Sequence, residues 1–117
     1  MTTSTLYYNA NCSKCRAALA LLEERGIAPR LVAYLEQPPT PAELAELLEQ
    51  LGFADARQLM RKSEAGYVAL GLEDPGLSQQ ALLDALAKHP KLIERPVFVN
   101  QGRAVIGRPP EKVPDIL

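Results

Sequence analysis

Residues 6–25, LYYNANCSKCRAALALLEER, decide the fold class of this chain. The apolar and aromatic run Leu6–Tyr8 predicts a short buried strand that enters a loop at Asn9. Strong helix formers follow from Ser13 to Arg25, and Gly26 is placed to end that helix. The stretch therefore predicts a strand, a loop and a helix in succession, with both cysteines of the chain at the start of the helix.

The remaining strand-like runs complete a mixed sheet around this unit. Arg30–Tyr34 is apolar and far enough from the first strand for a right-handed crossover, which predicts a parallel pair. Near the other end, Val97–Val99 and Ala104–Ile106 flank a glycine-containing turn and predict an antiparallel hairpin. The double proline at 109 and 110 suits the first turn of a last short helix.

Between these two parts the chain carries a helical insertion at about residues 40–90. Thr40 as N-cap, Pro41 at the first helical position, Glu43 completing a capping box and Gly52 after the last turn predict one well-bounded helix. We further expect a short helix over 54–62, a mostly irregular segment over 63–76 and a helix from Ser78 to Lys88. The order β-α-β, helical insertion, β-β-α predicts an α/β fold with a mixed four-stranded sheet, in a single domain of residues 1–117.

The amino-acid composition indicates which classes of protein this chain can belong to. The chain has 117 residues, of which 47% are hydrophobic and 23% charged, as in a soluble globular domain. We expect no membrane attachment, because no apolar run approaches the roughly 20 residues that span a bilayer. The formal net charge of −1 argues against a nucleic-acid partner. Met1–Thr5 lacks the basic and apolar pattern of a secretion signal, so we expect a reducing cytoplasm and no permanent disulfide.

The two cysteines, three positions apart, raise three possibilities: half of a metal site, a disulfide, or a reactive thiol with a helper. Structural zinc needs three or four protein ligands, and beyond Cys12 and Cys15 only His89 is an attractive one. A histidine before a proline at a helix end more often satisfies the last carbonyls of that helix. We therefore predict no metal site.

A reactive thiol fits the position of Cys12 best. The thiolate is the nucleophile, and a helix N-terminus stabilises it through backbone N–H groups and the helix dipole, to which Lys14 adds positive charge. Cys15 shares the apolar stripe of the helix with Leu19 and Leu22. It can therefore be either a core residue or a redox partner of Cys12, and the sequence leaves both open.

Three arginines stand at predicted element ends: Arg61 in LMRKS, Arg95 before Pro96, and Arg108 in IGRPP. A single arginine is most often a solvated surface charge. A helix N-terminus that stabilises a thiolate also binds tetrahedral anions, and arginine forks suit the same ligands. A cis bond before Pro96 would aim Arg95 rigidly, although cis is the minority state of X-Pro bonds.

Taken together, the motifs resemble those of one family. YYNANCSKCR, LMRK, HPKLIERPVFV and GRPPEKV occur in the order and spacing of the glutaredoxin-coupled arsenate reductases of the ArsC family. This resemblance implies a thioredoxin-like fold with a helical insertion and a nucleophilic Cys12. It also implies arsenate-binding roles for Arg61, Arg95 and Arg108, and a cis bond before Pro96.

The resemblance further implies a reaction and its partners. Arsenate would be reduced to arsenite through a covalent cysteine–arsenic adduct, with glutathione as the reducing co-substrate and glutaredoxin, or thioredoxin, restoring Cys12. No bound cofactor is expected, and the protein is expected to be a cytoplasmic monomer.

Two departures from the family pattern keep alternatives open. Tyr8 stands where many members have a histidine, and Cys15 is a second thiol that many members lack. Cys15 could resolve a Cys12 adduct into an internal disulfide. The CxxC pair is also typical of Spx-type regulators that bind RNA polymerase. Tyr8 leaves open a third possibility, a generic thiol-disulfide oxidoreductase of unknown substrate. Arg108 favours the reductase over the regulator.

Overall fold

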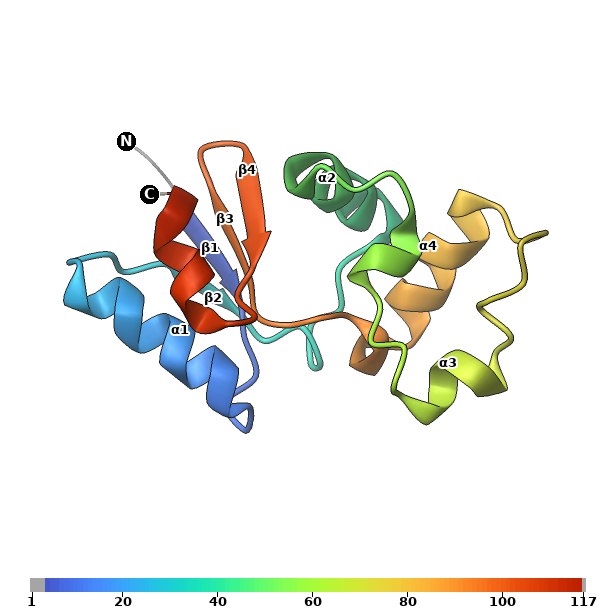
Figure 1. Cartoon of the computed structure of the whole chain (residues 1–117), viewed down its shortest axis with the longest axis horizontal. Coiled ribbons are helices and arrows are strands. Elements are labelled where there is room, and N and C mark those ends of the chain that lie inside the picture. Colours follow the sequence, from blue (N-terminus) through green and yellow to red (C-terminus); the bar gives the residue numbers. More distant parts are fainter. Residues whose placement is uncertain (1–3, 117) are drawn as a thin grey trace. The chain divides into compact units, whose positions relative to one another are not determined.

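Four short strands form the predicted mixed sheet. The structure, a computed structural model, describes residues 4–116. The strands are β1 (Ser4–Tyr7), β2 (Arg30–Val32), β3 (Val97–Asn100) and β4 (Arg103–Ile106). They lie in the order β2-β1-β3-β4 (Figure 1). The β1–β2 pair is parallel and the other two pairs are antiparallel, which confirms the predicted crossover and hairpin.

The hairpin between β3 and β4 turns on two residues with positive φ. Gln101 has φ 52° and Gly102 has φ 78°, as a type I′ turn requires. Asn100, the last residue of β3, is opposite Arg103 and donates a side-chain hydrogen bond to the Ile116 carbonyl at 3.1 Å. The turn therefore sets the register of β4 against β3.

Two helical segments pack together beside the sheet (Figure 1). They are α1 (Ser13–Glu24) and a 3₁₀ segment, η3 (Pro110–Ile116), which forms the predicted last helix. The core of this unit consists of fully buried apolar side chains from both segments and from β1 and β3: Leu6, Ala18, Leu22, Phe98 and Val113. This packing fixes the start of α1 with respect to the ends of the strands.

The chain divides into two compact units. The sheet unit consists of the segments up to Gln37 and from Arg95 onward, and the helical unit is Pro38–Glu94. The helical unit covers the region of the predicted insertion. That all 117 residues make one domain stays a prediction. Within residues 4–116, no helix has the length and apolar character needed to cross a membrane.

The helical unit contains both of the helices whose caps are readable in the sequence. In α2 (Pro41–Leu51) the Glu43 amide donates to Thr40 Oγ1 at 3.2 Å, and the Thr40 amide donates to Glu43 Oε1 at 2.9 Å. In α4 (Gln79–Lys88) the Ser78 hydroxyl accepts from the Ala81 amide at 3.1 Å. These capping predictions are confirmed.

The segment between α2 and α4 is more regular than we predict. The expected helix over 54–62 is a 3₁₀ segment, η1 (Ala56–Leu59), and the expected irregular segment contains α3 (Ala65–Ala69). A second 3₁₀ segment, η2 (Pro90–Leu92), follows α4. Tyr67 of α3 is 2% exposed, so burial of its ring stabilises a helix that local propensity does not favour.

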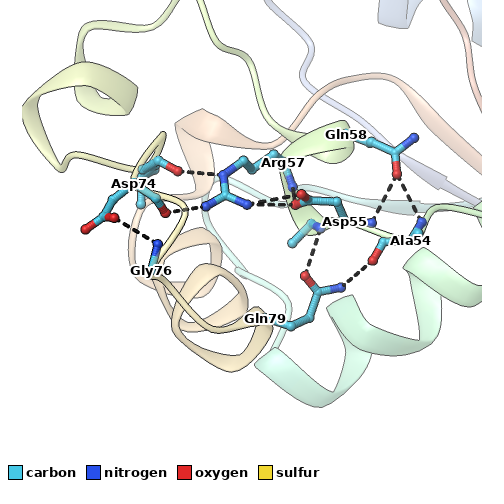
Figure 2. A network of polar contacts seen from close by, with 9 residues as sticks. Ala54, Asp55, Arg57, Gln58, Asp74, Gly76 and Gln79 are labelled. Atoms are coloured by element: carbon cyan, nitrogen blue, oxygen red, sulfur yellow. Dashed lines mark hydrogen bonds and ion pairs between the residues drawn. The ribbon is translucent and has the colours of Figure 1, made fainter.

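Arg57 holds η1 against the loop that follows α3 (Figure 2). Its guanidinium donates to the carbonyl oxygens of Leu72 at 2.7 Å and Asp74 at 2.6 Å. It also forms an ion pair with Asp55 at 3.0 Å. The charge-assisted contacts of Arg57 thus order a loop without regular backbone pairing.

Candidate functional site

The loop that leads into α1 is closed by its own backbone. The Cys12 amide donates to the Asn9 carbonyl at 2.9 Å, and the Asn11 amide donates to Asn9 Oδ1 at 3.0 Å. Cys12 itself is the N-cap of α1, with extended backbone angles, and its carbonyl accepts the first helical bond, from the Arg16 amide, at 3.1 Å. The Arg16 side chain donates back to the Ala10 carbonyl at 2.8 Å. Cys12 is therefore rigidly placed where the helix N-terminus begins.

Both cysteines are free thiols, and their surroundings differ. Cys12 is 8% exposed, whereas Cys15 is fully buried on the same face of α1 as Ala18 and Leu22. The predicted position of Cys15 on the apolar stripe is confirmed. That Cys15 also attacks an adduct on Cys12, to form a Cys12–Cys15 disulfide, stays a prediction.

The two thiols have opposite pKa shifts. Burial alone would raise the pKa of Cys12, but hydrogen bonds from the Cys15 amide and thiol, the charge of Arg95 and the Lys14 amide outweigh it and lower that pKa. For Cys15, burial together with the hydrogen bond and charge of Cys12 raises the pKa to about 12, against opposing effects of the Asn9 amide and Arg95. Cys12 is thus the thiol that ionises, and Cys15 keeps its proton.

Arg95, Pro96 and Arg108 lie in the same unit as the cysteines. The Arg95–Pro96 bond is cis, which confirms the expectation from the family resemblance, and the Arg108–Pro109 bond is also cis, which we do not predict. Arg108 Nη1 donates to the Arg95 carbonyl at 3.5 Å. The structure therefore brings Cys12, Arg95 and Arg108, which are far apart in the sequence, into one neighbourhood.

Arg61 belongs to the helical unit, and its backbone and side chain contact other residues of that unit. Its backbone amide donates to the Leu92 carbonyl at 2.7 Å, next to an isolated antiparallel bridge between Met60 and Ile93. Its side chain pairs with Glu64 at 3.3 Å, and both side chains are partly exposed. Sequence reasoning missed Glu64, although its three-residue spacing from Arg61 was a usable signal.

A hollow of about 380 Å³ opens beside the cysteine loop. Its wall includes Asn9 and Asn11 of that loop, Leu31 of β2, and Glu36. Tyr8 also lines the hollow while packing against the core of the sheet unit. Across residues 4–116, the structure has no group of three or more His, Cys, Asp or Glu side chains that could hold a metal ion. The arrangement suits a thiol nucleophile with cationic neighbours.

Comparisons with known proteins show the family and the fold of the chain. The model of the ArsC family matches residues 7–116. An arsenate reductase of Neisseria meningitidis is 48% identical over 112 residues, which cover 96% of each chain, and one of Escherichia coli is 37% identical over all of this chain and 82% of its own. A solved arsenate reductase from Vibrio cholerae superposes with a TM-score of 0.96 at 50% identity, covering 99% of this chain and 98% of that one. The predicted thioredoxin-like α/β fold is confirmed, and the chain belongs to the ArsC family.

Proposed function

We propose that this protein is an arsenate reductase in which Cys12 is the nucleophile. The observation that carries the proposal is the placement of Cys12: its sulfur sits at the N-cap of α1 with a lowered pKa, close enough to Arg95 to be influenced by its charge. The same elements, a helix N-terminus and arginines, attract a tetrahedral oxyanion. The relatives named as arsenate reductases support arsenate as that oxyanion.

In the first step the Cys12 thiolate attacks the arsenic of bound arsenate. A sulfur–arsenic bond forms, one arsenic–oxygen bond breaks, and the oxygen leaves as water after protonation. Arg95 and Arg108, with Arg61 as the third proposed ligand, offset the charge on the remaining oxygens. Arsenic is still As(V) in this adduct.

Reduction of the arsenic requires a second thiol, that of glutathione. Glutathione replaces another oxygen on the arsenic, and a sulfur–sulfur bond then forms between glutathione and Cys12. The oxygen displaced by glutathione leaves as water, and the arsenic accepts the electron pair of its two sulfur bonds, takes up one water molecule and leaves as arsenite, As(III). Glutaredoxin, or thioredoxin, would reduce the resulting mixed disulfide on Cys12, unless Cys15 displaces glutathione first to give a Cys12–Cys15 disulfide.

The test is a coupled assay of the purified protein with arsenate, glutathione, glutaredoxin and a reductant system. We expect arsenate-dependent oxidation of the reductant for the wild type, and loss of it for Cys12→Ser, because a serine hydroxyl is a far weaker nucleophile than a thiolate. Arg30→Lys, a change at an exposed arginine of β2, should act like the wild type.

Two outcomes would overturn the proposal. A wild-type protein without arsenate-dependent oxidation is not an arsenate reductase, and activity retained in Cys12→Ser removes Cys12 as the nucleophile. The second thiol at Cys15 is the observation that favours a redox regulator instead. Capture of RNA polymerase subunits by the oxidised chain, with no arsenate turnover, would support that function.

A further inference from the structure

We propose that the hollow beside the cysteine loop binds a short peptide thiol that carries a free amino group, and holds it so that its sulfur reaches Cys12. The inference deepens the proposed function and rests on it, since glutathione, the reducing co-substrate proposed there, is a thiol of this class. It gives a role to residues that the reduction steps leave unused. Every residue that lines the hollow belongs to the sheet unit.

The hollow opens at the carboxyl ends of two parallel strands. β1 and β2 run parallel, and the Tyr8 amide donates to the Val32 carbonyl at 2.9 Å, which ties the two sides of the hollow together. A crevice outside the carboxyl ends of parallel strands is the common ligand site of α/β sheets. Asn11 lines this one, and Cys12 follows it directly, so the two Cα atoms lie about 3.8 Å apart. A ligand in the hollow therefore lies against the loop that leads to the reacting sulfur.

Backbone hydrogen bonds fix the walls of the hollow. On the loop side, the Asn9 carbonyl accepts from the Cys12 amide at 2.9 Å. On the β2 side, the Ala33 carbonyl accepts from the amides of Glu36 at 2.9 Å and Gln37 at 2.8 Å. The volume of about 380 Å³ is in the range of sites that bind small molecules. Because both walls are formed in advance, a ligand binds here with little cost for ordering the backbone.

The β2 side of the hollow carries exposed apolar side chains. Leu31 is 47% exposed and Leu35 is 37% exposed, and they are two of the four large apolar side chains that are exposed within residues 4–116. With Ala33 they occupy alternate positions, whereas the intervening Tyr34 is 2% exposed. Exposed apolar groups that line a concave site favour a ligand with methylene groups of its own.

The polar groups at the hollow favour a peptide among such ligands. Glu36 is the only charged residue of the wall, and within residues 4–116 its carboxylate takes part in no ion pair or hydrogen bond, so it can accept from an ammonium group. The exposed side-chain amide of Asn11 suits a peptide group. Arg16 donates to the carbonyl of Ala10, another wall residue, at 2.8 Å, which places a guanidinium at this loop for a carboxylate. An ammonium, amide groups and a carboxylate are the polar groups of a short peptide.

The first experiment measures binding without any reaction. The full chain carrying Cys12→Ser, isotope-labelled for NMR, is titrated with S-methylglutathione, which has the peptide but no free thiol. We expect the amide signals of residues 8–11 and 31–36 to shift, and those of the helical unit to stay in place.

A modified ligand tests the contact with Glu36. N-acetyl-S-methylglutathione lacks the ammonium group, so it should bind about twofold to fivefold more weakly than S-methylglutathione, the range of an exposed ion pair. In the Glu36→Gln variant of the same chain the two ligands should bind equally, because the carboxylate partner is gone. Glu46→Gln, at an exposed position of α2, is the control and should keep the difference between the two ligands.

Two exposed leucines test the apolar side of the hollow. Leu35→Ser should weaken S-methylglutathione binding about threefold to tenfold, because the ligand then covers less apolar surface. The same loss should raise the KM for glutathione in the coupled assay. Leu70→Ser is the matched control, since Leu70 is 44% exposed in the helical unit, and it should bind the ligand as the parent chain does.

The inference is wrong if S-methylglutathione shifts no amide of the hollow, if N-acetylation weakens binding equally in Glu36→Gln, or if Leu35→Ser and Leu70→Ser lose equal affinity. The binding measurements use no arsenate. A chain that binds the peptide in the hollow but does not reduce arsenate therefore contradicts the proposed function and supports this site. Arsenate turnover without binding in the hollow contradicts this inference alone.

Discussion

The backbone amide of Gly107 donates a hydrogen bond to the carbonyl of Pro96 at 2.8 Å. The bond joins the residue after β4 to the residue before β3, and each partner adjoins an arginine, Arg108 and Arg95. This one backbone contact therefore places Arg95 and Arg108, the two candidate site arginines of the sheet unit. It lies where β3 and β4 pair through Val97 and Ile106.

Gly107→Ala tests this contact. A Cβ at position 107 would come within 2.8 Å of Val113 Cγ2 and 2.9 Å of Pro96 Cγ, so these buried groups must shift. We expect a loss of about 1–3 kcal/mol in the free energy of unfolding, together with weaker arsenate turnover as Arg95 and Arg108 move apart. Urea denaturation and the coupled assay measure both. Gly66→Ala is the control: its Cβ would lie 3.5 Å from Leu92 Cδ2, an ordinary contact, so it should not lower the free energy of unfolding. Equal losses of stability and turnover in the two variants would contradict the prediction.

Two changes at Arg95 separate its charge from its shape. Its positive charge favours the Cys12 thiolate, so Arg95→Gln should raise the pKa of Cys12 and shift the pH profile of its alkylation by iodoacetamide to higher pH. Arg95→Lys keeps the charge but loses the planar fork, so it should keep the profile near that of the wild type while weakening arsenate turnover. Arg30→Gln is the control. If the alkylation profile of Arg95→Gln equals that of the wild type, the charge of Arg95 is not needed to lower the pKa of Cys12.

Glu64 should compete with an oxyanion for Arg61. The two side chains pair at 3.3 Å, and this pairing must be given up, or shared, when Arg61 binds an anion. We expect Glu64→Gln to strengthen arsenate binding by about twofold to fivefold, the range that partly exposed ion pairs contribute. Calorimetry in the Cys12→Ser background measures binding without turnover, and Glu46→Gln on the exposed surface of α2 is the control. Weaker binding in Glu64→Gln would show that Glu64 positions Arg61 instead.

Arg57 is expected to be the residue whose loss most disturbs the loop after α3. Arg57→Lys keeps a charge but cannot reach Leu72, Asp74 and Asp55 together, so the free energy of unfolding should fall by about 2 kcal/mol. Limited proteolysis should also cut within residues 70–77 more readily. Lys91→Ala, at an exposed position of η2, is the control. Protease resistance equal to that of the wild type would contradict the prediction.

Local signals account for the elements that could be predicted from the sequence. The capping box at Thr40 and Glu43 and the N-cap at Ser78 are contacts within four residues, which the chain satisfies whatever surrounds it. The short helix α3 could not be predicted, because burial of Tyr67 stabilises it against weak local propensity. Glu64 was missed although its three-residue spacing from Arg61 was available, because oppositely charged residues at that spacing are common and most of them need not pair.

The sequence by itself determined that a strand, a loop and a helix place two thiols at a helix N-terminus, because backbone preferences over neighbouring residues decide that much. Only the tertiary structure decided that Cys12 and Cys15 differ in ionisation. The antiparallel pairing of β1 with β3 carries Arg95 to the loop after β1, and packing against the core removes Cys15 from water. Both effects act between segments distant in sequence. The apolar stripe of the helix predicts the face on which Cys15 lies, but how far Cys15 is removed from water, and which charge acts on Cys12, depend on the packed structure.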